Sequence, residues 1–253
     1  MRDTEEFYRV EAEFARWAQR EGLENGEQFI LSRYLEADKK TLEAGAAGGR
    51  LLLAMQAKGF KDLAGYDILP EFIDAARKRD KTGTIDYSVQ DGRSLSYPDN
   101  SFDQLVYLQQ FFSVVGNEAD RKKAAAEAFR VLRPGGRMVV SVLSMRGRSK
   151  ALAPLFAWLW LLRTITFRSR SLQNQPWLRS GNSPNYSALL DRGPYTYWYY
   201  EQETIDFLRA AGFVVEAVGS DAQVRAGEFY DPDKLPPNAP FAGRFYLVCS
   251  KPK

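Results

Sequence analysis

The chain has 253 residues, of which 45% are hydrophobic and 26% charged, a composition typical of globular proteins that excludes disorder as the main state. Because 35 basic residues face 32 acidic ones, the net charge is only +3, which gives no general argument for nucleic-acid binding. Histidine is absent, which excludes a histidine general base, a Ser-His-Asp triad and a histidine-ligated metal.

Cysteine content and the N-terminal residues bear on the compartment. The single cysteine, Cys249, cannot form an intramolecular disulfide, which fits a reducing compartment. The first six residues are mostly charged and lack the apolar core of a signal peptide. We therefore expect a cytoplasmic protein.

Apolar periodicity predicts an N-terminal helical region over 1–38, with helices near 5–19 and 26–36. Strands and helices then alternate over 40–143. The predicted strands are 40–44, 63–67, 84–89, 102–108 and 137–143, and the helices between them begin near 51, 70 and 118. Apolar strands separated by helices indicate a parallel sheet that is covered on both faces.

Residues 144–200 interrupt this alternation. A basic loop with Arg146, Arg148 and Lys150 precedes an apolar run over 151–162, and polar sequence then leads to an aromatic cluster over 195–200. The pattern resumes with a helix at 201–211 and strands at 213–219 and 244–250. We therefore expect one domain over 1–253, in which 144–200 is a cap insertion after the fifth strand and 201–253 completes the core.

A glycine-rich turn, Gly45-Ala46-Ala47-Gly48-Gly49, stands where the first predicted strand passes into a helix. Such turns let the backbone approach a ligand closely and direct N–H groups toward it. The dinucleotide-binding fingerprint Gly-x-Gly-x-x-Gly fails here, because Ala47 and Arg50 occupy its second and third glycine positions.

The segment Glu43-Ala44-Gly45-Ala46-Ala47-Gly48-Gly49 resembles the acidic-x-Gly-x-Gly-x-Gly signature of class I S-adenosylmethionine-dependent methyltransferases, and departs from it at Ala47. Four later segments resemble the same family in the same order. They are Gly65-Tyr66-Asp67-Ile68, Val89-Gln90-Asp91-Gly92, the strand from Ser101 to Gln109, and Phe129 to Gly136. The resemblance covers about 40–143 and, more loosely, 200–250.

This resemblance implies a Rossmann-like three-layer sandwich with a seven-stranded, mostly parallel sheet and an antiparallel last strand. It implies S-adenosylmethionine as cofactor, S-adenosylhomocysteine as product, and no metal. Asp67 is expected to hold the ribose hydroxyls, Asp91 the adenine amino group, and Gln109 lies near the methionine end. The implied cofactor residues are Glu43, Gly45, Ala47, Gly49, Asp67, Ile68, Asp91, Gly92 and Gln109.

Purely structural roles remain open for these residues. Asp67 is also a candidate helix N-cap before Pro70, Asp91 a turn residue beside Gly92, and the glycines a tight turn. The alternative function is a non-catalytic S-adenosylmethionine-binding regulator or an inactive partner subunit. Because histidine is absent, we expect no histidine-like limb between about pH 5 and 8 in the rate of transfer.

Aromatic residues are the candidates for binding a methyl acceptor, because they supply apolar walls and attract a sulfonium. They are Tyr8, Trp17, Tyr195, Tyr197 and Trp198, and for each the alternative is packing within the cap. We expect a small-molecule acceptor that is apolar, aromatic or lipid-like, methylated on oxygen, nitrogen or carbon. No nucleic acid is expected, since no basic stripe accompanies these aromatics. The sequence assigns no catalytic residue.

The apolar run at 151–162 predicts a helix that is apolar all round, so water cannot surround it. The eleven residues from Leu152 to Leu162 span about 16 Å, roughly half of a hydrocarbon core, so the helix is too short to cross a membrane. One alternative is a helix that roofs the acceptor pocket or packs on a second subunit. The other is peripheral membrane contact through 151–170, helped by flanking basic residues such as Arg163, Arg168 and Arg170. The oligomeric state stays open.

Overall fold

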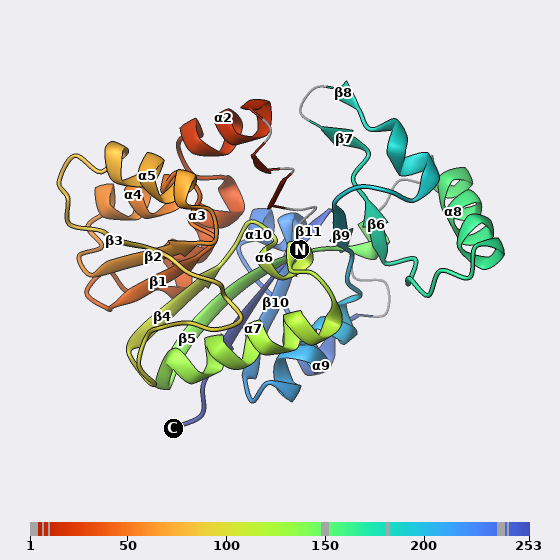
Figure 1. Ribbon diagram of the computed structural model, residues 1–253. Coiled ribbons are helices and arrows are strands. Elements are labelled where there is room, and N and C mark those ends of the chain that lie inside the picture. Colours follow the sequence, from red (N-terminus) through yellow and green to blue (C-terminus); the bar gives the residue numbers. More distant parts are fainter. Residues whose placement is uncertain are drawn as a thin grey trace.

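The computed structural model describes residues 5–6, 8–9, 11–147, 152–180, 183–236, 241 and 243–253. Its centre is a seven-stranded sheet with the order β10-β11-β5-β4-β1-β2-β3 (Figure 1). The strands are β1 Thr41–Ala44, β2 Leu63–Asp67, β3 Asp86–Val89, β4 Phe102–Tyr107, β5 Leu132–Leu143, β10 Val214–Ser220 and β11 Arg244–Ser250. Neighbouring strands from β1 to β5 are parallel, and β11 is antiparallel to both β5 and β10. The predicted mostly parallel sheet with an antiparallel last strand is confirmed.

Helices cover both faces of the sheet and complete the three layers (Figure 1). On one face lie α3 Asn25–Tyr34, α4 Arg50–Ala57, α5 Pro70–Arg79 and α10 Asp221–Ala226, and on the other α6 Phe111–Val114, α7 Glu118–Val131 and α9 Glu201–Ala210. Neighbouring residues of β4, Leu105 and Val106, belong to opposite apolar clusters, because successive side chains of a strand point to opposite faces. The helix α2 Glu11–Gln19 packs beside α5.

Several elements differ from the sequence expectation, among them β5, α10, α6 and the short strands within 174–197 of the insertion. The Arg133-Pro134-Gly135-Gly136 segment, expected as a turn, belongs to β5, which begins at Leu132. Its pairing with β4 shifts register between Phe102 and Gln104, so this part of β5 bulges, which suits a proline that has no N–H to donate. The short helix α10 was not predicted.

The insertion after β5 forms a separate group of small elements (Figure 1). It contains η1 Met145–Gly147, α8 Ala153–Ile165, β6 Asn174–Pro176, β7 Arg179–Ser180, β8 Ser183–Pro184, η3 Tyr186–Leu190 and β9 Tyr195–Tyr197. β6 pairs with β9, and β7 with β8, both antiparallel. We call residues 152–198 of this insertion the cap. Arg148, Lys150 and the first residue of the apolar run lie outside the described residues. After the insertion, a short helix, η4 Pro232–Lys234, precedes β11. Among the helices that the structure describes, none has the length and apolar character needed to cross a bilayer.

Candidate functional site

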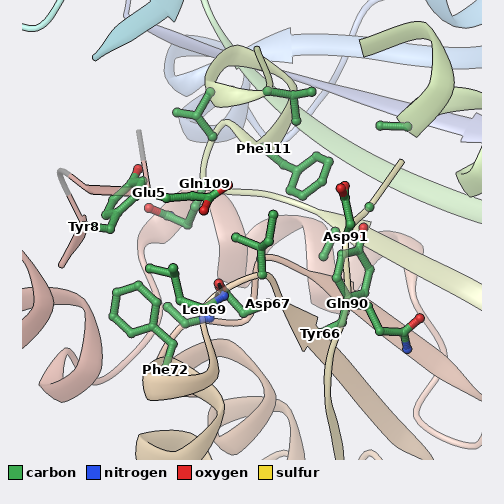
Figure 2. Close-up of a pocket in the computed structure, with 18 of the residues that line it drawn as sticks. Glu5, Tyr8, Tyr66, Asp67, Leu69, Phe72, Gln90, Asp91, Gln109 and Phe111 are labelled. Atoms are coloured by element: carbon green, nitrogen blue, oxygen red, sulfur yellow. Dashed lines mark hydrogen bonds between the residues drawn. The ribbon is translucent and has the colours of Figure 1, made fainter. Parts of the chain in front are cut away.

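A cavity opens at the carboxyl ends of β1, β2 and β4, where the strand order reverses (Figure 2). This switch point is the usual ligand site of open α/β sheets. Seven of the nine predicted cofactor residues line the cavity: Gly45, Ala47, Asp67, Ile68, Asp91, Gly92 and Gln109. Figure 2 shows Tyr8, Glu5 and Gln109 grouped at one end of the cavity, with Asp91, Gln90 and Tyr66 at the other.

The glycine-rich turn between β1 and α4 depends on left-handed backbone at three positions. Gly45, Ala47 and Gly49 have φ values of 67°, 45° and 75°. A Cβ on Gly49 would lie 2.4 Å from the Tyr87 hydroxyl, so no larger residue fits there. Ala47, where the family usually has glycine, adopts this conformation at a cost of about 1 kcal/mol. The departure at Ala47 therefore leaves the shape of the turn intact.

Asp67 ends β2 beneath this turn and faces the cavity (Figure 2). Its Oδ2 accepts a hydrogen bond from the Ala47 N–H at 3.0 Å, and its Oδ1 accepts one from the Leu69 N–H at 3.0 Å. Burial raises the pKa of Asp67 to about 6, although these backbone donors oppose the rise. Each carboxylate oxygen keeps acceptor capacity, which suits a vicinal diol in the cavity. Asp67 thus makes the hydrogen bond of a helix N-cap to Leu69 and also faces the cavity, so the two roles considered for it are compatible.

Asp91 lies after β3 and is held by an arginine that the sequence analysis did not select. Nε of Arg93 donates to both carboxylate oxygens of Asp91 at 2.9 Å, and a second ion pair of 3.1 Å joins Arg93 to Asp120. The hydrogen bonds from Arg93 hold the pKa of Asp91 below its usual range. Asp91 is therefore an ionised acceptor of fixed orientation at its end of the cavity.

Gln109 follows β4 in the left-handed conformation, with φ of 54°. Its side-chain amide donates to Glu27 on α3, and its oxygen accepts from Arg20 at 3.3 Å. Glu27 is buried and forms a two-pronged ion pair with Arg50, the first residue of α4, with N···O distances of 2.5 and 2.7 Å. This network links the N-terminal helices to the glycine turn and to Gln109, and the sequence offered no local signal for it.

Glu43 and Gly49, the other two predicted cofactor residues, do not line the cavity. Glu43 is 6% exposed and lies behind the turn, where its Oε2 has no hydrogen-bond partner among the described residues. Burial raises the pKa of Glu43 well above its usual value, and nearby Arg50 opposes that rise. This arrangement places Glu43 under the turn rather than beside a ligand.

Aromatic side chains form one wall of the cavity. Tyr8, Trp17 and Phe72 line it, and Tyr8 meets the other two edge to face at ring-centroid distances of 6.4 and 6.3 Å. Trp177 of the insertion packs against Tyr8 at 5.8 Å. Of these four, the sequence analysis selected Tyr8 and Trp17 for the acceptor site.

The other three acceptor candidates lie elsewhere. Tyr195 is covered by the guanidinium of Arg170 at 4.0 Å, and Tyr197 by that of Arg121 at 4.0 Å. Neither these tyrosines nor Trp198 line the cavity. No residue of α8 lines it either, so this cavity gives no support to the alternative in which this helix roofs the acceptor pocket.

Comparison with known proteins agrees with this geometry. A family model of a methyltransferase domain matches residues 42–140. A demethylmenaquinone methyltransferase of Thermus thermophilus is 31% identical over 108 residues, which are 42% of this chain and 47% of that protein. The chain thus matches about half of the length of that relative.

Two solved structures share the fold. A methyltransferase from Methanosarcina mazei superposes with a TM-score of 0.66 at 22% identity and covers 88% of this chain and 97% of that one. A Burkholderia thailandensis 1,6-didemethyltoxoflavin-N1-methyltransferase, solved with bound 1,6-didemethyltoxoflavin and S-adenosylhomocysteine, gives a TM-score of 0.55 at 16% identity over 90% of this chain and 77% of that one. Residues 42–140 thus match a methyltransferase domain, and the chain shares the fold of S-adenosylmethionine-dependent methyltransferases, the family that its motifs resemble.

Proposed function

We propose that the cavity binds S-adenosylmethionine and that the chain transfers its methyl group to a small apolar or aromatic acceptor. Asp67 carries the proposal, because a buried carboxylate faces the cavity between a glycine-rich turn and an ionised Asp91. Two acidic acceptors in this order match a ribose diol and an adenine amino group. Gln109, whose side-chain oxygen accepts a hydrogen bond from Arg20, lines the end left for the amino-acid part of the cofactor.

The residues present fit the cofactor by shape as well as by charge. Gly45 has no side chain on the cavity side, and a Cβ there would come within 3.3 Å of the Phe111 ring. A Cβ on Gly92 would lie 2.8 Å from both Phe111 and the Tyr66 hydroxyl. Side chains at these positions would fill space at the cavity wall, so the two glycines keep the cavity open.

The cofactor supplies an electrophilic methyl group on a sulfonium, and the protein holds an acceptor atom about 3 Å from it in a dry site. The wall formed by Tyr8, Trp17 and Phe72 supplies the apolar surface for that acceptor. An apolar acceptor also occurs among relatives, since the matched Thermus protein is named for demethylmenaquinone. We assign Tyr8 and Trp17, but not Tyr195, Tyr197 or Trp198, to acceptor binding.

A hydroxyl acceptor also needs a group that takes its proton. The acidic residues lining the cavity are Glu5, Asp67 and Asp91. Since the cofactor engages the two aspartates, Glu5 is the carboxylate left for this role, beside Tyr8 and Gln109 (Figure 2). An amine acceptor would need no such base.

Binding calorimetry with S-adenosylmethionine and S-adenosylhomocysteine tests the cofactor site. Asp67→Asn should weaken both by about 1.5–3 kcal/mol, the scale of a hydrogen bond to a charged group. Asp74→Asn, which removes an exposed carboxylate from α5, should leave both affinities within about threefold of wild type. Absence of wild-type binding, or tighter binding of a dinucleotide, contradicts the proposal.

Transfer itself is tested with labelled cofactor and fractionated small-molecule extracts. We expect label in a small apolar or aromatic product and its loss in Asp67→Asn. Tight binding without transfer to any fraction would instead support the alternative of a non-catalytic regulator or an inactive partner subunit.

A further inference from the structure

The cap exposes an apolar surface of unusual extent, formed by the outward side chains of residues 153–167 and 186–190, which we call the cap face. Trp160, Ile165 and Phe167 are 57%, 64% and 95% exposed. Eight of the eleven large apolar side chains that are exposed in the described part of the chain lie in this face. Single exposed apolar residues are common, whereas a contiguous group of this size marks an interaction site.

The sequence of α8 explains why the face is apolar. The helix turns Leu159 and Arg163 inward, where they are 0% and 4% exposed. Arg163 is its only charged residue, so every outward position is apolar except Thr164, whose hydroxyl bonds the Trp160 carbonyl at 2.8 Å. Because α8 is apolar on both faces, we expect its outward face as well to be covered by an apolar surface rather than by water.

The two parts of the cap face are fixed to each other. The Trp158 indole N–H donates to the Leu189 carbonyl at 2.8 Å, and Arg168 donates to the Leu190 carbonyl at 3.0 Å. Arg163 binds the Asp191 carboxylate at 2.9 and 3.1 Å, directly after η3. The cap face is thus one surface, held from beneath by buried polar contacts.

The charge around this face is mainly positive. Residues 152–200 contain five arginines and a single acidic residue, Asp191. Asp191 is 2% exposed and lies between Arg163 and Arg168, so it adds no negative charge to the surface. Glu6 is an exposed carboxylate beside Phe167 and Arg168, and the arginines outnumber it. Arg179 and Arg192 are exposed next to the cap face. An apolar face with a basic border is complementary to an anionic lipid surface.

We propose that the cap face docks reversibly on an anionic membrane, with α8 lying in the interface and the exposed arginines at the headgroups. α8 is too short to cross the bilayer, so the contact is peripheral. A second copy of the chain is the weaker candidate, because two like-charged caps would repel each other across the contact. This inference stands apart from methyl transfer, since no residue of α8 lines the cofactor cavity.

Cosedimentation of the full chain with vesicles tests the inference. We expect binding to vesicles of phosphatidylcholine and phosphatidylglycerol at low salt, weaker binding at high salt, and little binding to pure phosphatidylcholine. The double variant Trp160→Ser/Ile165→Ser should weaken binding at least about tenfold. Its control, Val214→Ser, removes an apolar side chain of 50% exposure on β10 and should bind like wild type.

Charge is tested separately. Arg179→Gln/Arg192→Gln should weaken binding by about 10- to 30-fold, because each basic residue near an anionic surface contributes about a factor of five. Lys58→Gln/Lys61→Gln removes the same charge from exposed sites on the sheet domain and should have little effect. Wild-type protein that stays in the supernatant at low salt overturns the inference. So does a wild-type dimer in sedimentation velocity that Trp160→Ser/Ile165→Ser dissociates, since the cap face would then be a subunit interface. Neither result bears on cofactor binding.

Discussion

Asp67 combines burial, two backbone donors and a position at the cavity, and this combination makes its charge depend on pH in an unusual range. Its pKa of about 6 in the free protein lies above the ordinary aspartate value of 3.8. The ionised form is the one that accepts two hydrogen bonds from a diol, so cofactor binding favours loss of the proton. Affinity should therefore rise as pH increases through about 6 and level off above it.

The size of this effect follows from the fraction of Asp67 that is ionised. With a pKa near 6, about one molecule in ten is ionised at pH 5, so the affinity there should be about tenfold below its plateau. Calorimetry between pH 5 and 8 measures it, and Asp67→Asn serves as control because titration of the cofactor itself persists in that variant. A wild-type profile parallel to that of Asp67→Asn would contradict the assignment. The absence of histidine thus does not by itself predict a flat profile.

Individual site residues were predictable where a strand end fixed them. Asp67 ends β2, whereas Asp91 and Gln109 follow β3 and β4, and parallel strands bring such positions to one edge of the sheet. Trp177 could not be found this way, since it reaches Tyr8 through an insertion without regular periodicity. The aromatic cluster over 195–200 misled for the same reason, because a high density of aromatic residues in the sequence does not show whether their side chains line the cavity.

At the scale of elements, Arg79 of α5 ties the end of α2 to the glycine turn. Arg79 donates to the carbonyls of Ala18 and Gly48 at 2.7 and 2.8 Å, and to that of Arg20 at 2.9 Å. The fit is close, because a Cβ on Gly48 would lie 2.2 Å from the Ala18 oxygen. Since Trp17 precedes Ala18 and lines the cavity, the position of α2 matters for the site.

Arg79→Gln should release the end of α2, because it removes a charged donor from three carbonyls. We expect a loss of about 2 kcal/mol in local stability. Hydrogen exchange of the α2 amides should become faster, and cofactor affinity should fall with it. Lys78→Gln removes the same charge from an exposed neighbouring position on α5 and provides the control. Unchanged exchange in α2 would show that packing of its apolar side chains alone holds the helix.

Elements with strong periodicity were predicted to within about two residues, as for α9 and β11, whereas weakly patterned ones were not. α10 is six residues long and carries Gln223 and Arg225, so its sequence has no apolar repeat from which a helix could be predicted. The extension of β5 through Pro134 and two glycines contradicts the low strand propensity of these residues. Hydrogen bonds to a neighbouring segment, such as that from the Gly135 N–H to the Lys251 carbonyl at 2.8 Å, overcome this low propensity. Tertiary contacts of this kind are not encoded in a short window of sequence.

For the whole molecule, the main division is between the sheet domain and the cap. The two largest apolar clusters span the sheet and the helices on its faces, and they include no residue of α8. Near the sheet, the insertion is tied by the Tyr199 N–H to the Leu143 carbonyl and by the Met145 N–H to the Tyr199 carbonyl, both at 2.8 Å. Inside the cap, the ion pair between Arg163 and Asp191 is buried, where other domains have an apolar core.

That ion pair should decide whether the cap folds as a unit of its own. Burial alone raises the pKa of Asp191, but the hydrogen bonds from Arg163 hold it below its usual value, so the pair is ionised. Asp191→Asn leaves the Arg163 charge buried without its partner, at a cost of about 3–5 kcal/mol to the cap. Asparagine tolerates the left-handed φ of 53° at this position, so the backbone is not the cause. We expect faster hydrogen exchange over 153–197, with sheet amides and cofactor affinity close to those of wild type and of the exposed-site control Asp62→Asn. Exchange that rose equally in the sheet would mean that cap and sheet unfold as one cooperative unit.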